Sequence, residues 1–407
     1  MFETIFNTDC AVTRHRTGPL ARERARYLYR CASQGATAKS LRLKARSTVW
    51  VAARMSIQDF GWVSAERLRE IVCGCTEPVV APSTASTLVR SARAWLKFLG
   101  WWHEPQEPVP FKEDLERFVS WMRDERELTA CTVDQWRYRA IRFLCWCADT
   151  GLNLATLQPR DIDSYFATYG VQHWSRVSSR HMANFLRIFL RHAASIGACR
   201  PGLSDSIQCG PRYALESLPY ALDWEDVRRV IAGAYGDDER SVRDRAILLL
   251  LAVYGLRRGE VAALRIDQVD RANGRLQIWR LKRRQPQIYP LVSPVAEALG
   301  RYIDEARPAV GSAEIFIRVR APRVPITAPA IYNIVNRRLL ALGLQAAHLG
   351  PHALRHSCAA RLLAKGLTIK EIGDHLGHRT SMPTMTYTKV DLASLRQVAE
   401  LDLGGLQ

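Results

Sequence analysis

The chain has 407 residues and a formal net charge of +18, with 58 Lys and Arg against 40 Asp and Glu. This length exceeds one small core, so we expect two or three domains. The sequence has no apolar run of the roughly 18 residues that a transmembrane helix needs, and its first residues lack the pattern of a secretory signal. We therefore expect a cytoplasmic protein with no membrane partner. Its positive charge favours a polyanion as partner, most commonly nucleic acid, over ordinary solvated charge or ribosome association.

The ten cysteines do not show the spacing of common zinc sites. Cys73 and Cys75 form a C-x-C pair, and so do Cys145 and Cys147, whereas zinc sites commonly use C-x2-C pairs. Cys145 and Cys147 lie in a helix-like apolar run, which predicts small, buried, reduced thiols. The sequence therefore predicts no metal site.

Residues 1–105 are predicted to form a basic, helical N-terminal region. Residues 1–60 hold eleven Lys and Arg against four Asp and Glu, a net charge of +7. Helical runs begin after Pro19 and cover about 39–55 and 84–101, and prolines at 105, 108 and 110 end the region.

Residues 106–200 are predicted to form a compact helical domain. Apolar residues recur at helical spacing in two stripes. The stripes are Leu115, Phe118, Val119 and Met122, and then Val133, Trp136, Ala140, Phe143 and Cys147. Further helices are expected over 157–169 and from Met182 to a stop at Gly197. Arg137, Arg139 and Arg142 lie on the other sides of the second helix, where they are either solvated charges or contacts to phosphate.

Residues 201–222 carry three prolines and two glycines without a clear period, and we interpret them as an interdomain linker. Residues 223–407 form the last predicted domain. It begins with a helix start at Asp223, and a long helix over 242–254 follows that stops at Gly255.

A β-hairpin is predicted next, because RLQIW and QIYPLV flank the basic segment LKRRQP. A further strand is expected over 315–319, and the remainder is helical up to a C-terminal tail helix. The predicted fold class is therefore mainly α with a small antiparallel β-sheet in the last domain (α+β).

Five short segments of the last domain carry residue types that suit phosphate chemistry. They are YGLRRGE with Arg257, the hairpin tip with Lys282, PHALRH with His352 and Arg355, LGH with His378, and Tyr387 nine residues later. A tyrosine hydroxyl has a pKa near ~10 and attacks a phosphodiester only with a proton acceptor or nearby cations. Each residue alone has an ordinary explanation as a surface charge, a turn residue or a core tyrosine. Arg258 is as good a candidate as Arg257, and Arg283 and Arg284 accompany Lys282.

In this order and spacing the segments resemble the tyrosine recombinase (phage-type integrase) family. Its pattern is G-L-R-x-[SG]-E, a hairpin lysine, H-x-x-R-H, L-G-H and a tyrosine nine residues on, and the sequence matches every position. The resemblance covers the last domain in detail and 111–200 loosely, as the family's core-binding domain, and it implies a clamp-like arrangement on DNA. PLARER with Tyr27 and Leu28 is similar to the N-terminal segments of integrases from transposon-like elements.

The resemblance implies site-specific recombination of double-stranded DNA through a covalent 3′-phosphotyrosyl intermediate, without a cofactor or a metal. It implies that Tyr387 is the nucleophile, that Arg257 and Arg355 bind the phosphate, and that Lys282 is the general acid. His352 and His378 assist, and Glu260 supports an arginine or His352 as a neighbour. Arg283 and Arg284 at the hairpin tip are candidate DNA contacts. Partners are DNA and further protomers, either a homotetramer in the synaptic complex or a hetero-oligomer with related recombinases.

Two alternatives remain from the sequence. A type IB topoisomerase uses the same active-site chemistry and acts as a monomer. The helical domain and the hairpin spacing favour a recombinase over it. A catalytically silent DNA-binding accessory protein would be expected to lack one of the six catalytic positions. The C-terminal tail helix packs either on its own domain or on a neighbouring protomer.

Overall fold

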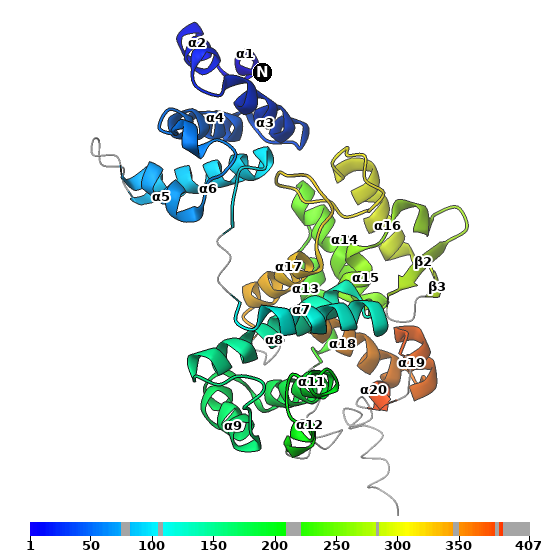
Figure 1. The fold of residues 1–407 in the computed structure, drawn as a ribbon. Coiled ribbons are helices and arrows are strands. Elements are labelled where there is room, and N and C mark those ends of the chain that lie inside the picture. The colour runs from blue at the N-terminus through cyan, green and yellow to red at the C-terminus, as the bar shows by residue number, and fades with distance from the viewer. Residues whose placement is uncertain are drawn as a thin grey trace, which may run out of the picture. The chain divides into compact units, whose positions relative to one another are not determined.

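The computed structural model describes residues 1–74, 82–104, 109–208, 221–281, 285–344, 350–378 and 382–385 (Figure 1). The chain divides into two compact units, one of His103–Ala214 and one of Met1–Trp102 with Leu215–Gln407. The described residues are mostly helical and contain one three-stranded sheet, as the predicted fold class requires. None of their helices combines the length and the apolar character that crossing a bilayer demands.

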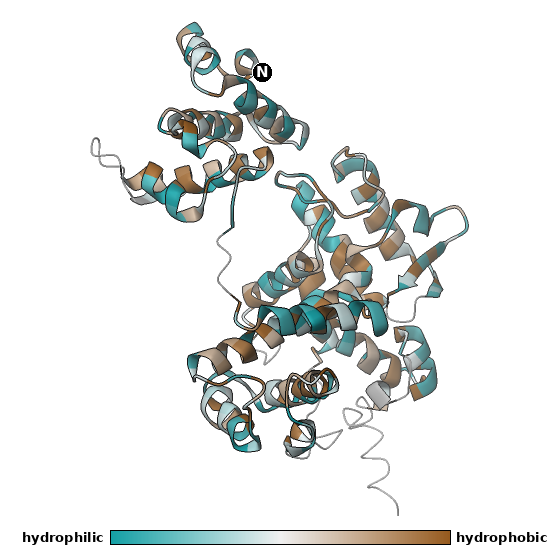
Figure 2. Cartoon of the chain, in the orientation of Figure 1, coloured by the Kyte–Doolittle hydropathy of each residue, from teal (hydrophilic) through white to brown (hydrophobic). Residues whose placement is uncertain are grey.

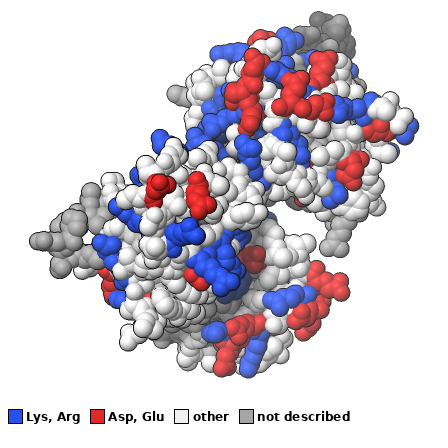
Figure 3. All heavy atoms as spheres, turned by 90° about the horizontal axis from the view of Figure 1, so that it is seen from above, with Lys and Arg blue, Asp and Glu red and all other residues white. Residues whose placement is uncertain are grey.

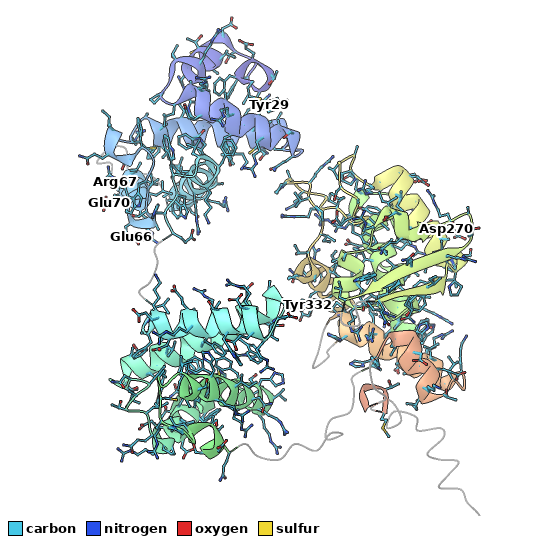
Figure 4. All side chains as sticks on the ribbon, turned by 45° about the vertical axis from the view of Figure 1, so that its right-hand side comes forward. Tyr29, Glu66, Arg67, Glu70, Asp270 and Tyr332 are labelled. Atoms are coloured by element: carbon cyan, nitrogen blue, oxygen red, sulfur yellow. The ribbon has the colours of Figure 1, made fainter. Side chains whose placement is uncertain are left out.

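The first 102 residues form helices that pack on two small apolar clusters. Their elements are α1 (Phe2–Ile5), α2 (Asp9–Thr17), α3 (Ala21–Ser33), α4 (Ala38–Ala52), η1 (Ile57–Asp59), α5 (Ala65–Cys73) and α6 (Pro82–Leu99). Thr37 and Ser64 cap α4 and α5 by accepting hydrogen bonds from backbone N–H groups. Arg67 on α5 pairs with Asp59 at 2.7 Å and with Glu70 at 3.1 Å (Figure 4).

The unit His103–Ala214 is wholly helical in its described part. Its elements are α7 (Lys112–Ser120), η2 (Trp121–Glu125), α8 (Ala130–Asp149), α9 (Pro159–Ser164), η3 (Tyr165–Gly170), α10 (Val171–His173), α11 (Arg176–Ser195) and α12 (Leu203–Ser206). The two predicted stripes meet in its core, where Phe118 and Phe143 are fully buried. Cys147 is also buried, and this burial raises the pKa of its thiol to about 12, whereas Cys145 is only half-buried.

The predicted linker over 201–222 begins too early. Leu203 and Ile207 are 1% and 3% exposed and pack in the core of the helical unit. Short α12 therefore belongs to this unit, because its apolar side chains fill the core although prolines and glycines surround it. Residues 209–220 lie outside the described part of the chain.

The described residues from 221 onward form a second set of helices with the sheet. The elements are α13 (Trp224–Ala232), α14 (Glu239–Val253), α15 (Arg258–Ala262), η4 (Ile266–Gln268), β1 (Val269–Asp270), β2 (Arg275–Arg280), β3 (Gln285–Pro290), α16 (Ser293–Arg301), η5 (Tyr302–Ala306), α17 (Ala328–Ala341), α18 (Pro351–Ala364), α19 (Ile369–Leu376) and α20 (Met382–Met385). Helix α14 lies at the centre, and Figure 2 shows hydrophobic residues along much of it. This burial on every side explains its nearly continuous apolar run.

The predicted hairpin is confirmed: β2 pairs antiparallel with β3, and β1 pairs with the other edge of β2, ending at Asp270 (Figure 4). Burial alternates along β2, so that Leu276, Ile278 and Arg280 face the core. The hairpin tip with Lys282, Arg283 and Arg284 lies outside the described residues.

The predicted strand over 315–319 is wrong. This segment makes only an isolated bridge, between Ile317 and Pro325, and Arg265 bridges to Glu314 just before it. Ile315, Phe316 and Ile317 are consecutive and all fully buried, so the segment lacks the two-residue alternation of a half-buried strand. It is an apolar loop that crosses the core.

Candidate active site and nucleic-acid interface

The turn after α14 is built on Gly255. Its φ is 58°, and a Cβ atom there would lie 2.5 Å from Cδ2 of Leu376. A side chain at this position is therefore excluded both by the backbone conformation and by the packing of α19. The glycine brings the segment before Arg257 directly against the end of α19.

Arg257 precedes α15 and is held by Glu260 one turn later. The Glu260 carboxylate accepts from the backbone N–H of Arg257 at 2.8 Å and from its Nη1 at 2.9 Å. Nη2 of Arg257 donates to the carbonyl of Gly377 at 3.3 Å. The Glu260 side chain is 1% exposed and that of Arg257 22% exposed, so a buried carboxylate orients a guanidinium that reaches solvent.

Arg355 on α18 approaches the same place from the other side. It is buried, and its guanidinium donates to the carbonyl of Gly255 and, at 2.8 Å, to the carbonyl of Leu376. Arg257 and Arg355 therefore hold neighbouring carbonyls, those of Gly377 and Leu376, at the end of α19. This places two permanent positive charges around one short backbone segment.

His378 follows this segment directly. Gly377 has a φ of 67° and ends α19, and the N–H of His378 donates to the carbonyl of Gly373 at 2.9 Å. Nδ1 of His378 forms a 2.7 Å hydrogen bond with the hydroxyl of Thr384, which is buried. The histidine is therefore fixed through both its backbone and its ring.

His352 lies one turn before Arg355 on α18 and is exposed. Its ring centroid is 6.4 Å from that of His356, the next residue on the same helix face. The structure thus brings Arg257, Glu260, Arg355 and His378 together and places His352 on the helix that carries Arg355. Lys282 and Tyr387 lie outside the described residues.

A basic cavity at the other end of α14 was not predicted from the sequence. Its volume is about 590 Å³, and none of its described lining residues is acidic. Five arginines contribute to it: Arg240, Arg243, Arg318, Arg320 and Arg337. Asn333 and Asn336 of α17 also line it. Asn333 directly follows Tyr332, which is labelled in Figure 4. Because the 15 residues of α14 span about 22 Å, this cavity is well separated from Arg257.

A cavity of about 620 Å³ lies on the helical unit, between α8 and α11. Two of the three arginines predicted on α8, Arg139 and Arg142, line it, whereas Arg137 does not. Its aromatic lining residues are Tyr138, His173, Trp174 and His181. Arg142 donates from Nε to the hydroxyl of Tyr169 at 3.0 Å, which fixes its guanidinium. Cationic and aromatic side chains in one groove are typical of nucleic-acid contact.

Lys and Arg side chains occur in several groups on the face shown in Figure 3, with Asp and Glu between them. On this face, cationic side chains are therefore interspersed with acidic ones.

Comparison with known proteins identifies the relatives of this chain. The sequence profile of the phage integrase family matches residues 221–393. A putative integrase/recombinase, y4rA of Sinorhizobium fredii (strain NBRC 101917 / NGR234), is 31% identical over 294 residues, which cover 72% of this chain and 71% of that protein. Tyrosine recombinase XerC of Azotobacter vinelandii (strain DJ / ATCC BAA-1303) is 29% identical over 291 residues, covering 70% of this chain and 94% of that protein.

Solved structures share the fold at lower identity. XerH site-specific recombinase bound to a palindromic difH substrate aligns with a TM-score of 0.56 and 16% identity, over 88% of this chain and 96% of that one. A lambda integrase dimer bound to a core site aligns with a TM-score of 0.53 and 17% identity, over 68% of this chain and 94% of that one. From its sequence relatives, this chain belongs to the phage integrase family of tyrosine recombinases.

Proposed function

We propose that this chain cuts and rejoins duplex DNA at specific sites, with Tyr387 as the nucleophile and a covalent 3′-phosphotyrosyl intermediate. Membership of the family supports recombination over the alternatives of a topoisomerase and a silent accessory protein. The observation that carries the residue assignment is the shared hold of Arg257 and Arg355 on the carbonyls of Gly377 and Leu376, immediately before His378.

In the proposed mechanism Arg257 and Arg355 bind the non-bridging oxygens of the scissile phosphate. Negative charge grows on these oxygens in the transition state, and preorganised guanidinium groups stabilise it without reorienting. Glu260 supplies that preorganisation for Arg257, and the two backbone carbonyls supply it for Arg355. His378 donates a further hydrogen bond to a phosphate oxygen.

The remaining roles concern the protons. The hydroxyl oxygen of Tyr387 attacks phosphorus, its proton passes toward His352, and the bond from phosphorus to the 5′ oxygen breaks. Lys282 gives a proton to that leaving oxygen. One phosphodiester is exchanged for one phosphotyrosyl ester, so that a 5′ hydroxyl can reverse the step and rejoin the strands without an external energy source.

The two arginine-lined cavities are proposed contacts to the DNA backbone. Arginine suits this role because its planar group pairs with phosphate oxygens and stays charged. The cavity of Arg240, Arg318 and Arg320 would contact phosphates away from the scissile one, and the cavity of Arg139 and Arg142 would bind through the helical unit. Such contacts position a duplex and make its binding sensitive to salt.

Recombination of two duplexes involves four strand cleavages, so we propose four protomers in the synaptic complex, either identical or shared with related recombinases. A mobile element is the proposed context. The Tn1549 transposon integrase in complex with a circular intermediate DNA shares the fold, with a TM-score of 0.51 and 17% identity. In that context the chain acts at the nucleoid.

The test is covalent capture. A duplex is selected from a random-sequence library by adducts with the wild-type chain that survive SDS, and a nick near the cut site traps the product. We expect Tyr387→Phe to abolish the adduct while DNA binding stays intact, and Tyr332→Phe, at a partly exposed tyrosine on α17, to leave it unchanged. Adducts formed by the Tyr387→Phe protein would falsify the assignment. Relaxation of plasmids that lack the selected site would instead indicate a topoisomerase.

A further inference from the structure

Arg280, the last residue of β2, is a charged residue on the buried face of the sheet. It follows Leu276 and Ile278 on that face, and its side chain is only 1% exposed. A buried cation is tolerated only when its donors are paired, so its surroundings show what it holds together.

Its guanidinium donates to four partners on three elements, β3, α15 and α19. Nη1 bonds Oε2 of Glu260 at 2.6 Å, and Nε bonds Oε1 of Gln287 at 2.8 Å. Nη2 bonds the carbonyl of His375 at 2.8 Å and also the hydroxyl of Tyr289. One planar group therefore joins the hairpin strands β2 and β3 to α15 and to the end of α19.

The contact with Glu260 and a further contact of Arg280, with Gly377, also determine where Arg257 lies. Oε2 of Glu260, which accepts from Arg280, accepts from the backbone N–H of Arg257 as well. Arg280 also packs on Gly377, because a Cβ atom there would lie 2.6 Å from Nε of Arg280, and the carbonyl of Gly377 accepts from Arg257. Both groups that orient Arg257 therefore contact the same buried arginine.

We propose that Arg280 is a positioning residue that anchors the β2–β3 hairpin to Glu260 and to the end of α19, and thereby fixes the guanidinium of Arg257. It contacts no reacting atom and acts through Glu260 and the backbone of residues 375–377. Lys282 follows it by two positions in the sequence, so the anchored strand is also the one that leads to the proposed general acid. The inference rests on the proposed role of Arg257 in binding phosphate.

The first experiment needs no DNA. Hydrogen–deuterium exchange on the full chain compares wild type with Arg280→Met, and with Arg275→Met as a matched control, because Arg275 begins the same strand but is exposed. We expect Arg280→Met to accelerate exchange at 285–290, at 257–261 and at 373–378, and Arg275→Met to leave the last two segments unchanged. Faster exchange confined to the hairpin would overturn the proposed anchoring.

The second experiment measures rate and affinity separately on the nicked duplex selected by the wild-type chain, at a temperature where circular dichroism shows every variant folded. Misplacing a catalytic group by about 1 Å can cost on the order of 100-fold in rate. We expect Arg280→Met to slow adduct formation by at least about 10-fold, with its DNA dissociation constant within about twofold of wild type. Arg280→Lys keeps the positive charge but lacks the planar guanidinium with its several donors, and it should recover part of the rate.

A lower melting temperature with an unchanged adduct rate would reduce Arg280 to a stabilising residue and overturn the proposal. If Arg280→Met does not fold, Arg280→Lys decides: a rate at least threefold below wild type at equal affinity supports positioning, and a wild-type rate contradicts it. If the wild-type chain forms no adduct on any duplex, the proposed function fails, whereas the exchange experiment still decides whether Arg280 anchors these segments.

Discussion

Glu260 accepts two hydrogen bonds from Arg257, one from the backbone at 2.8 Å and one from the guanidinium at 2.9 Å. The pair is three residues apart, so the backbone bond starts α15 while the side-chain bond aims the arginine. The carboxylate is buried and the arginine partly exposed. The buried Glu260 carboxylate thus fixes the guanidinium of Arg257 at the surface. A phosphate-binding arginine needs this arrangement, because its remaining N–H donors are then already oriented for a ligand.

The first prediction separates Arg257 from its neighbour Arg258, which the sequence could not do. Arg258 is exposed at the start of α15. We expect Arg257→Ala to slow adduct formation by roughly 100-fold, the cost of losing one preorganised donor, and Arg258→Ala to change it less than threefold. Single-turnover rates on the selected duplex measure both. If Arg258→Ala slowed adduct formation and Arg257→Ala did not, the phosphate-binding role would belong to Arg258 instead.

Arg355 should combine a catalytic with a structural effect. Arg355→Ala removes the donor to the carbonyls of Gly255 and Leu376, and an unpaired buried polar group costs about 1–3 kcal/mol. We therefore expect a lower melting temperature as well as a rate loss of roughly 100-fold. Thermal denaturation followed by circular dichroism gives the first quantity and single-turnover cleavage the second. A loss of stability without a loss of rate at low temperature would show that Arg355 has a structural role only.

The third prediction concerns the proton given to the leaving oxygen. Lys282→Ala should slow cleavage of an ordinary phosphodiester, whereas a substrate with sulfur at the 5′ bridging position should react at nearly the wild-type rate, because a thiolate leaves without a proton. Arg283→Ala serves as the matched control, since it removes an adjacent charge. If the sulfur substrate restored the rate of Arg283→Ala but not that of Lys282→Ala, the general acid would be a residue other than Lys282.

The fourth prediction tests the arginine cavity at the start of α14. Arg318 and Arg320 are exposed, and among the described residues no carboxylate forms an ion pair with either. Arg318→Ala/Arg320→Ala should weaken duplex binding and lower the slope of log K against log salt by about 1 for each lost phosphate contact.

The control for the cavity is Arg265→Ala/Arg271→Ala, which removes the same charge from exposed arginines that already pair with Asp267 and Asp304. Fluorescence anisotropy with a labelled duplex over a range of salt concentrations gives both slopes. Equal slopes for the two double variants would show that net charge, and not the cavity, determines the binding.

Sequence periodicity predicted the helices and the hairpin because each depends on residues that are close along the chain. The apolar stripes of α7 and α8 and the alternation in β2 are of this kind. The segment 315–319 failed because three consecutive buried residues do not distinguish a strand from a loop that crosses a core. The predicted start of the linker was wrong because composition alone does not show that Leu203 packs in the core of the preceding helical unit.

The same reasoning applies to the candidate site. The motifs named Arg257, Glu260, Arg355 and His378, and the structure brings these residues together. Arg280 was not found, since its bond to the carbonyl of His375 joins positions 95 residues apart. A signal did exist: in RLQIWR the charged Arg280 shares the buried face of Leu276 and Ile278, which indicates that a partner for it lies inside the domain.

The last prediction concerns pH and the N-terminal helices. His15 is buried and stacks on Phe2 and Phe6, with ring centroids 5.6 Å and 4.4 Å away. Its Nδ1 lies 3.3 Å from Nη1 of Arg24, and because a guanidinium can only donate, this nitrogen must accept and the ring must be neutral. Burial first, and then the charge of Arg24, lower the pKa of His15 to about 4.

The sign follows from linkage. Between the ordinary histidine pKa of about 6.5 and the folded value of about 4, the unfolded chain binds a proton that the folded chain excludes, so acid destabilises the N-terminal helices. A difference of this size corresponds to at most about 3 kcal/mol. Hydrogen exchange of residues 1–52 should therefore accelerate as pH falls from 7 to 4, after correction for intrinsic rates. His15→Phe keeps an aromatic ring without a proton site and should flatten this dependence. An equally steep pH dependence of exchange in His15→Phe would show that groups other than His15 cause it.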